Sequence, residues 1–565
     1  MRNTHDSGWV LGLGGSSHDF SAALMKDCDI RVAIETERIN RVKHGRCLWY
    51  QDPLKGAIDY CLQAEGISRH QVSLAVSNDL LPIRARRFNE DFPLKLYQHH
   101  LCHAASVAMM LRPSSRAAIL VYDGMGSVKP VNSESLGPAV RRETFSFYSL
   151  ESGRLTALGA SYGDGYLEHV DYTNGATNSI GMLYELVTVV LGFHPDDVGK
   201  TMGLAGWGRP RFLDVLLDFV QLCDSMDDVF RFNPFDGRFE RTLLDLLEGE
   251  NRNFQVRADL AASVQELFNR TLLHCYRLIR ELDVEFVGLA GGCALNSVAN
   301  GILAKQIDAE GARHQLLIPP YAGDSGLAFG ALWLHLMEND RQDVTFRSMP
   351  PTPQIGRPGR NYTRADIQAA VAKFYPRLAL DCSVAGPEQL ARVIAAGRIV
   401  GLLQGRSEIG PRALGGRSVL ADPRSPLVRE RINRNIKLRE PFRPLAPMVL
   451  ADHFDEYFYP SGTKDYFMLT VARATDRCSR EAPAVVHVDG GARVQIVDES
   501  SDPFLVRLLT EFHELTGVPI LLNTSFNRRG EPIVETPEQA IEAFLEMGLD
   551  GLYLQDQFWL SASSV

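Results

Sequence analysis

Short apolar runs followed by glycine recur along the first part of the chain. They occupy residues 9–15, 117–127, 285–296 and 314–331, and each predicts a buried strand that runs into a glycine-rich turn. Residues 21–38 read as a hairpin followed by a turn. Because three of the glycine turns fall in one predicted domain, we expect a split nucleotide site at the ends of sheet strands.

This pattern stops between about Asn339 and Arg360, where proline, glycine and charged residues dominate. Such a stretch predicts a domain boundary. Beyond it, residues 363–374 and 387–398 have the periodicity of amphipathic helices, and residues 398–405 read as a buried strand. The predicted organisation is an α/β protein with a first domain over residues 1–345, a linker over residues 346–360 and a second domain over residues 361–565.

The composition is typical of a globular protein. The chain has 565 residues, which is long enough for two or more domains, and 45% are hydrophobic and 23% charged. Apolar runs stay shorter than about 18–20 residues, so no membrane span is predicted, and the first residues show no secretory signal. Nine cysteines without a CxxC pair indicate free thiols, as expected in a reducing cytoplasm.

The charge distribution is uneven. A net charge of -10 argues against a nucleic-acid partner, because phosphate contacts need clustered cations. Residues 406–443 nevertheless contain nine arginines and Lys437 against four acidic residues. A local surplus of cations in an acidic chain predicts a site for a small polyanion.

A metal site is predicted around two histidines. His99 and His103 are spaced i, i+4 in a predicted helix, so they share one face, whereas His100 should point elsewhere. Paired histidines alone fit a structural, hydrogen-bonded role equally well. Asp123 and Asp324, each placed where an apolar strand meets a glycine turn, favour the metal. A mixed nitrogen and oxygen set suits iron, manganese or zinc, and calcium is disfavoured.

The glycine turns predict a phosphate-binding site, because glycine lets backbone N–H groups approach a phosphate without a Cβ clash. Gly199, Lys200 and Thr201 resemble the end of a P-loop, but His194 stands where that motif needs glycine. The G-x-S-x-G string at residues 159–163 lacks the strand and helix that a nucleophile elbow requires. The residues predicted to line the nucleotide site are Gly124, Gly126, Lys200, Gly291, Gly292 and Asn296.

The cation-rich segment predicts a second anion site. Its arginines are interleaved with glycine and proline instead of following one solvated helix face, which favours a pocket over a charged surface. Guanidinium groups bind phosphate in a bidentate fashion. The candidate residues, including polar groups at two later strand ends, are Arg412, Arg417, Lys437, Arg443, Arg493, Asn523 and Ser525.

Ten strings together resemble the NodU/tobramycin-type O-carbamoyltransferase family, in that family's order and over nearly the whole chain. They are SSHDFSAAL, RVKHG, HHLCHAAS, YDGMGS, GKTMGLAGWG, GGCALN, AGDSGLAFGA, EIGPRALGGRS, EPFRPLAP and LNTSFN. Two residues depart from the family's usual pattern: Ser17 precedes His18 where glycine is frequent, and Cys293 replaces a frequent valine. Neither change removes a functional group.

The resemblance implies a fold and a reaction. The first domain is similar to the actin/Hsp70-type (ASKHA) fold of TsaD-like threonylcarbamoyl transferases, and the second to YrdC. ATP and carbamoyl phosphate would form carbamoyl adenylate in the second domain. The resemblance leaves open whether Mg²⁺ accompanies ATP. The first domain, holding iron by preference, would then carbamoylate a hydroxyl of a small natural-product acceptor. Partners would include neither a membrane nor nucleic acid, and an oligomer is left open.

Roles for two further residues also come from the resemblance. His18 would be the base that activates the acceptor hydroxyl, with a capping or core histidine as its alternative. Lys43 would bind phosphate or the carbamoyl group. Residues 161–177 are the least family-like and are expected to shape the acceptor pocket. Two other functions stay open: a tRNA threonylcarbamoyl transferase, and an actin-like ATP-binding regulator that transfers nothing.

Overall fold

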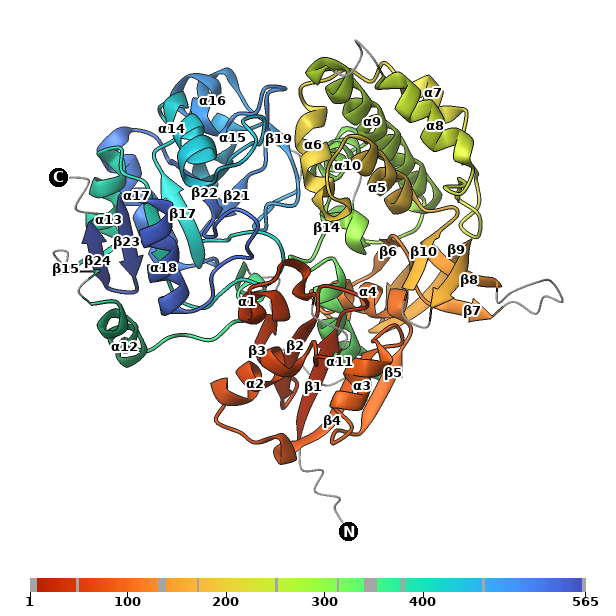
Figure 1. The fold of residues 1–565 in the computed structure, drawn as a ribbon, viewed down its shortest axis with the longest axis horizontal. Coiled ribbons are helices and arrows are strands. Elements are labelled where there is room, and N and C mark those ends of the chain that lie inside the picture. The colour runs from red at the N-terminus through yellow and green to blue at the C-terminus, as the bar shows by residue number, and fades with distance from the viewer. Residues whose placement is uncertain are drawn as a thin grey trace. The chain divides into compact units, whose positions relative to one another are not determined.

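The protein was analysed as a computed structural model, which describes residues 8–46, 50–130, 139–169, 172–248, 253–311, 314–339, 353–375, 377–378, 382–459 and 463–560. The chain forms two compact units: unit 1 comprises residues 1–11, 18–73 and 351–565, and unit 2 comprises residues 12–17 and 74–350. Both mix helices and strands, which confirms the predicted α/β class (Figure 1). The predicted linker lies largely outside the described residues, and the domain boundaries stay a prediction.

The first sheet has five strands in the order β3-β2-β1-β4-β5. The predicted hairpin is confirmed, because β2 and β3 pair antiparallel from Ser21 opposite Glu35 to Lys26 opposite Asp29. Its connection is made by Asp27 and Cys28, whose φ values of 52° and 68° are those of a type I′ turn. The strands are β1 (Trp9–Gly14), β2 (Ser21–Lys26), β3 (Asp29–Glu35), β4 (Val72–Asn78) and β5 (Leu94–Tyr97).

Unit 2 contains a sheet in the order β10-β9-β8-β6-β13-β14, with β7 paired to β8. β6 and β13 run parallel, and β6 is buried over its whole length, as expected for an uninterrupted apolar run. The strands are β6 (Ala117–Tyr122), β7 (Val128–Pro130), β8 (Ala139–Glu151), β9 (Arg154–His169), β10 (Tyr172–Ala176), β13 (Phe286–Ala290) and β14 (Gln315–Leu317), with a separate pair, β11 (Gln221–Leu222) and β12 (Phe230–Arg231).

Helix α4, which carries the paired histidines, packs closely on α11. Gly330 makes this approach feasible, because a Cβ there would lie 1.8 Å from the carbonyl oxygen of Cys102. The helices of unit 2 are α3 (Ile83–Phe88), α4 (His99–Ala108), α5 (Ile180–Val190), α6 (Val198–Ala205), α7 (Leu213–Leu217), α8 (Gly237–Leu246), α9 (Phe254–Ile279), α10 (Ser297–Ala309) and α11 (Leu327–Glu338).

Unit 1 contains an eight-stranded sheet in the order β15-β24-β23-β16-β17-β22-β18-β21. The buried strand predicted at residues 398–405 is β16. The strands are β15 (Cys382–Val384), β16 (Val400–Leu403), β17 (Arg417–Ala421), β18 (Ala446–Leu450), β21 (Gln495–Val497), β22 (Ile520–Ser525), β23 (Gly551–Leu554) and β24 (Gln557–Leu560), with a separate pair, β19 (Ala472–Arg473) and β20 (Gly491–Ala492).

Helices flank these strands in unit 1. The two amphipathic helices predicted after the boundary are confirmed as α12 and α13, and the latter packs against α17. Among the described residues, no helix is both long and apolar enough to cross a membrane. The helices are α1 (Thr36–Asn40), α2 (Lys55–Ala64), α12 (Arg364–Phe374), α13 (Pro387–Ala395), α14 (Pro426–Arg431), α15 (Phe454–Tyr457), α16 (Asp476–Glu481), α17 (Pro503–Thr516) and α18 (Pro537–Met547).

Candidate functional site

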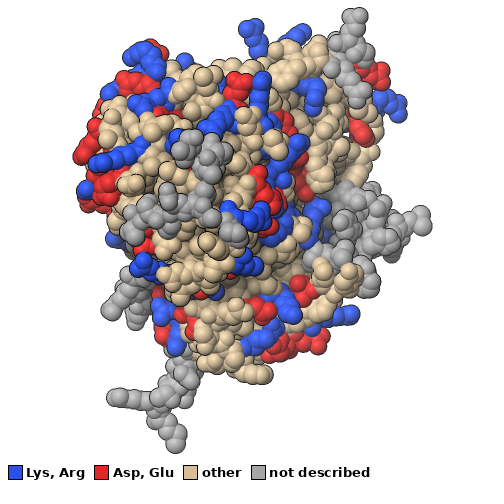
Figure 2. All heavy atoms as spheres, turned by 60° about the vertical axis from the view of Figure 1, so that its left-hand side comes forward, with Lys and Arg blue, Asp and Glu red and all other residues tan. Residues whose placement is uncertain are grey.

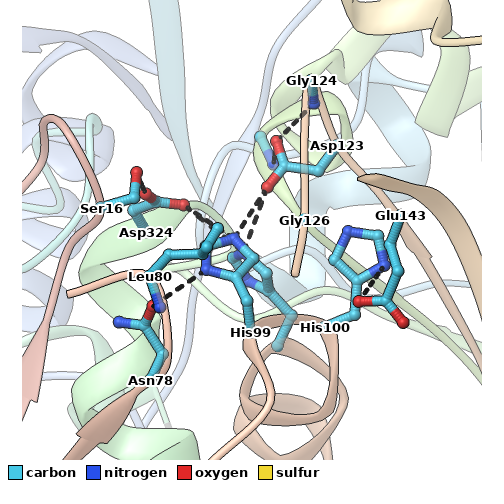
Figure 3. Close-up of polar contacts among 12 residues, drawn as sticks. Ser16, Asn78, Leu80, His99, His100, Asp123, Gly124, Gly126, Glu143 and Asp324 are labelled. Carbon is cyan, nitrogen blue, oxygen red and sulfur yellow. Dashed lines mark hydrogen bonds and ion pairs between the residues drawn. The ribbon is translucent and has the colours of Figure 1, made fainter. Parts of the chain in front are cut away.

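Four side chains of unit 2 converge at the start of α4, as Figure 3 shows. The Nε2 atoms of His99 and His103 each lie 3.3 Å from Oδ2 of Asp123. Oδ1 of Asp324 lies 3.7 Å from Nε2 of His99 and 3.5 Å from Nε2 of His103. The structure therefore brings together all four residues of the predicted metal set, and their ligand atoms all lie within 4.8 Å of one another.

Neighbouring groups orient three of these side chains. Nδ1 of His99 lies 3.1 Å from Oδ1 of Asn78, which leaves Nε2 to face the carboxylates. Oδ1 of Asp123 accepts hydrogen bonds from the backbone N–H groups of Gly124 and Gly292. The hydroxyl of Ser16 donates to Oδ2 of Asp324 over 2.5 Å. Such outer partners fix ligand geometry in metal sites.

The four residues fit a divalent cation. Both ring nitrogens of His103 are buried without a hydrogen-bond partner among the described residues. The separations of 3.3–3.7 Å between nitrogen and oxygen are long for hydrogen bonds. They match the edge of about 3.4 Å expected for a tetrahedron of ligands about 2.1 Å from a metal. Two imidazoles and two carboxylates suit iron, manganese or zinc.

The electrostatics of the set agree with this fit. Burial opposes a charged His103, but the adjacent carboxylates of Asp123 and Asp324 outweigh burial and raise the pKa of His103 to about 9. Burial also opposes a charged Asp123, because it raises the pKa of the carboxyl, but the two histidines outweigh burial and lower that pKa well below the ordinary value. The carboxylate pair therefore demands positive charge, which either protons or a metal ion would supply.

His100 points away from this set, as predicted. Its Nδ1 lies 2.8 Å from the hydroxyl of Ser146 and 3.8 Å from Oε2 of Glu143. Burial, followed by the charge of His99, lowers the pKa of His100 well below its ordinary value, so this ring is neutral. Gly126 leaves room for it, because a Cβ there would lie 2.5 Å from Nε2 of His100.

The position of Asp324 differs from the prediction. The strand before it, β14, ends at Leu317, and Asp324 begins a short 3-10 helix seven residues later. Ile318 follows the strand and is itself followed by Pro319 and Pro320, and proline cannot donate to a strand ladder. The carbonyl of Ala322 instead accepts a hydrogen bond from the N–H of Gly291, which ties the two glycine turns together.

The predicted nucleotide residues of unit 2 divide into two kinds. Gly124 has open space where a Cβ would stand, so a ligand can approach its backbone. Gly291 has a φ of 92° and lies against the carbonyl of Tyr122, so its role includes shaping the turn. Asn296 caps α10 by accepting from the N–H of Ala299, and Lys200 forms an ion pair with Asp197 at 2.9 Å. Nucleotide binding here stays a prediction.

Two other predictions concern the middle of the chain. Residues 159–163 lie within strand β9, so the G-x-S-x-G string does not form a nucleophile elbow. The side chain of Ser161 donates to the carbonyl of Met226, as a structural hydroxyl does. The segment 161–177, expected to shape the acceptor pocket, runs along β9 and β10 and lies partly outside the described residues.

His18 belongs to a hydrogen-bonded set in unit 1. Its Nδ1 lies 3.0 Å from one carboxylate oxygen of Asp19, and Nδ1 of His44 lies 3.0 Å from the other. Burial raises the pKa of Asp19, but the two imidazoles outweigh burial and lower it overall. Asp19 therefore stays ionised and orients both rings. Lys43 is exposed and lies directly before His44.

The second anion site is a cationic cluster, defined here as Arg412, Lys437, Arg439, Arg443 and Arg493. Burial first, and then the charges of neighbouring arginines, lower the pKa of Arg493 to about 10 and of Arg439 to about 9. The same causes, in the same order, lower the pKa values of Arg412 and Lys437 well below their ordinary ranges. Mutual repulsion among buried cations marks the cluster as a candidate anion-binding site.

Sequence reasoning had passed over Arg439, which lies in the same cation-rich segment. On the face of the molecule in Figure 2, basic and acidic side chains are intermixed. The positive charges of the cationic cluster are instead gathered inside unit 1.

Several predicted anion ligands hold the loops around this cluster. Arg417 is fully buried and donates to the carbonyls of Gly405, Gly416 and Glu535. The ammonium group of Lys437 donates to the carbonyls of Ser525 and Asn527 and to the side chain of Asn527.

Two polar side chains act in the same way. Asn523 donates to the carbonyl of Ala413 and to Gln495. The hydroxyl of Ser525 donates to the side chain of Asn527. Direct contact of these groups with an anion stays a prediction, whereas their part in shaping the loops is visible.

Comparison with known proteins identifies the family. Residues 84–333 match the family model described as carbamoyltransferase N-terminus, and residues 391–560 match the model described as carbamoyltransferase C-terminus. The chain is 31% identical to the sll1178 protein of Synechocystis sp., over 97% of this chain and 96% of that protein. It is also 31% identical to nodulation protein NolNO of Sinorhizobium fredii, over 95% of this chain and 78% of that protein.

Among solved structures, HypF of T. kodakarensis aligns with 60% of this chain and 48% of its own, at 15% identity and a TM-score of 0.34, which is too low to assign a fold. The family models and the sequence relatives decide the matter. The chain belongs to the carbamoyltransferase family.

Proposed function

We propose that this protein is an ATP-dependent O-carbamoyltransferase that makes carbamoyl adenylate and transfers its carbamoyl group to a hydroxyl of a small natural product. The first predicted domain, residues 1–345, would be TsaD-like with an ASKHA fold and would perform transfer. The second, residues 361–565, would be YrdC-like and would perform activation. Family membership supports carbamoyl transfer, and the cationic cluster supports the choice of substrates.

The cationic cluster is the observation that carries this proposal. ATP and carbamoyl phosphate are both anions and repel each other in water. The positive charges of Arg412, Arg443 and Arg493, which interact with one another, would offset that repulsion and favour simultaneous binding. An uncharged or singly charged pair of substrates would not require so many buried cations at one point.

Activation needs a bond between a carbamate oxygen and the α-phosphorus of ATP, with pyrophosphate leaving. The phosphate of carbamoyl phosphate is lost when water cleaves its bond to the carbamoyl group. Guanidinium groups next to both phosphates stabilise the charge that builds up on each leaving group. The products are carbamoyl adenylate, pyrophosphate and phosphate, in which all atoms of the substrates and the water are accounted for.

Transfer requires a base, because an acceptor hydroxyl has a high pKa. His18 is suited to this task, since Asp19 fixes its Nδ1 and favours a proton at Nε2 once the hydroxyl proton is accepted. Lys43 would stabilise the phosphate or carbamoyl group by its positive charge. The residues His99, His103, Asp123 and Asp324 would hold the metal, iron by preference. A bound metal would act as a Lewis acid toward the adenylate phosphate as AMP departs.

Incubation with carbamoyl phosphate, ATP and a panel of hydroxylated metabolites tests the proposal. Mass spectrometry should show one carbamoyl group in place of a hydrogen on an acceptor, together with AMP and pyrophosphate. Arg412→Ala should abolish pyrophosphate release, whereas Arg473→Gln, which alters an exposed arginine of β19, should not. Unchanged pyrophosphate release in Arg412→Ala would show that the cationic cluster is not the activation site.

A further inference from the structure

Helix α1 (Thr36–Asn40) is fastened to two loops from the far end of the sequence, all within unit 1. Arg38 donates through Nη2 to the carbonyl of Gly410 over 2.5 Å. Arg41, which follows the helix, donates to the carbonyls of Ile533 and Pro532 over 2.6 and 2.8 Å. Gly410 lies two residues before Arg412, so α1 is bonded directly to the loop that carries a member of the cationic cluster.

The same helix is bonded to the segment that holds His18. Oε2 of Glu37 accepts from the backbone N–H of His44 over 2.8 Å. The carbonyl of His44 accepts from the backbone N–H of Asp19 over 2.7 Å. The Asp19 carboxylate in turn contacts the imidazoles of His18 and His44. A short hydrogen-bonded path therefore leads from α1 to the proposed base.

Glu37 and Arg38 join the two halves of this path. Nε of Arg38 lies 3.4 Å from Oε1 of Glu37, and Oε2 of Glu35 accepts from both Nε and Nη2 of Arg38. The guanidinium is only 2% exposed, so it cannot exchange these partners for water. Moving Gly410 would therefore leave a buried charge incompletely paired unless Arg38 and its carboxylates moved as well.

The backbone along the path is held in an unfavourable conformation. Asp19, Arg41 and His44 have φ values of 51°, 61° and 61°, in the left-handed region that residues with a Cβ rarely adopt. Such conformations persist only where surrounding contacts enforce them. Here the enforcing contacts are the hydrogen bonds that connect α1 with the loops, so releasing one contact frees the segment to relax.

We propose that Glu37 and Arg38 are positioning residues that couple anion binding at the cationic cluster to the placement of His18. This coupling rests on the proposed function, in which the cluster activates and His18 accepts the proton. Binding of ATP and carbamoyl phosphate fixes the loop at Gly410. The fixed loop restrains Arg38, and Arg38 restrains Glu37 through their ion pair. Glu37 then restrains His18 through its hydrogen bond to His44 and the contact of Asp19 with both histidines. Transfer thus becomes competent only when activation has begun.

Hydrogen–deuterium exchange of the full-length protein, with and without ATP plus carbamoyl phosphate, tests the coupling. Both substrates should protect residues 408–417 and also slow exchange in residues 36–46 by about fivefold or more. Glu37→Ala should keep the first effect and lose the second, with pyrophosphate release retained. Glu388→Ala, which removes an exposed surface ion pair with Arg507, is the matched control and should keep both.

The outcomes separate the coupling from the proposed function. Absence of protection at residues 408–417 in the unaltered protein would refute anion binding at the cluster itself. Protection there without any change at residues 36–46 would refute the coupling alone. Arg38→Lys, which keeps the charge but loses the forked donor, gives a second variant should Glu37→Ala melt at a much lower temperature. An unaltered response of residues 36–46 in both variants would also refute the coupling.

Discussion

Replacing Arg493 by glutamine should stabilise the protein without ligand and weaken its response to ligand. Arg493 lies in the cationic cluster, where burial and then the charge of Arg443 lower its pKa from the ordinary arginine value to about 10. Its Nε has no hydrogen-bond partner among the described residues. Glutamine keeps a polar side chain at this position and removes the positive charge, so the change isolates the electrostatic contribution.

The magnitude follows from the difference in pKa between the unfolded and folded states. At about 1.4 kcal/mol per pH unit, a fall from the ordinary value of an arginine to about 10 costs the folded protein roughly 3 kcal/mol. The folded pKa is the lower one, so this penalty is complete at any pH below about 10 and disappears only as the pH rises toward the pKa of arginine in the unfolded chain. At pH 7, after losses in packing, we expect a net gain of about 1–2 kcal/mol, or a few degrees in apparent Tm.

Thermal melts of both proteins, with and without ATP plus carbamoyl phosphate, would measure the gain in stability without ligand and the weaker stabilisation by ligand. A ligand at a hundred times its Kd stabilises by about 2.7 kcal/mol, and the variant should gain much less. Arg473→Gln, at the exposed position of strand β19, is the control, and it should alter neither the Tm nor the response to ligand. Two results together would refute the reasoning. They are a lower Tm of Arg493→Gln without ligand, and a stabilisation by ligand equal to that of the original protein. In that case repulsion among the arginines does not destabilise the unliganded protein, and Arg493 does not contribute to anion binding.

Three other predictions concern metal binding and transfer. His99→Ala should lose the metal, measured by elemental analysis, and lose acceptor carbamoylation, while pyrophosphate release continues. His18→Ala should slow transfer by about 10²–10⁴-fold with pyrophosphate release unchanged, and a near-normal transfer rate would remove His18 from the mechanism. Gly126→Ala should cost about 1–3 kcal/mol and reduce metal content, because its Cβ would lie 2.5 Å from Nε2 of His100. Gly124→Ala, with open space around the added methyl, should leave metal content and Tm unchanged.

Local patterns in the sequence were sufficient to predict part of the metal set. The i, i+4 spacing placed His99 and His103 on one face of α4, and the apolar run of β6 placed Asp123 at a strand end. Asp324 is predicted for the same set, but the strand before it ends at Leu317, shortly before two prolines. The spacing of apolar residues predicts the structure of a single helix or strand. The path of the loop that carries Asp324 depends instead on a long-range contact, the hydrogen bond from Gly291 to Ala322.

The cationic segment shows where residue type alone is insufficient. Sequence reasoning treated Arg412, Arg417 and Lys437 as equivalent candidates for binding phosphate. In the structure, carbonyl groups of the chain surround Arg417 and Lys437, and these two hold loops in place. An arginine that binds phosphate and an arginine that binds backbone carbonyls look alike in a sequence. Both occur in buried segments rich in glycine and proline, and only the structure shows which acceptors the guanidinium meets.

The dense anchoring of the loop at residues 408–417 has a physical reason that joins these observations. Cations that repel one another push their own backbone apart, and only fixed contacts can resist this in the absence of ligand. Oε1 of Glu408 accepts from the N–H groups of Leu414, Gly416 and Arg417, and Arg38 holds Gly410 from the opposite end of the sequence. Positive charge held in this way is already in place when an anion arrives, so binding only tightens the loop further, which is how electrostatic catalysis gains its strength. Repulsion among the cations lowers stability, so substitutions that remove one of the cations should yield proteins that are harder to unfold and poorer at activation.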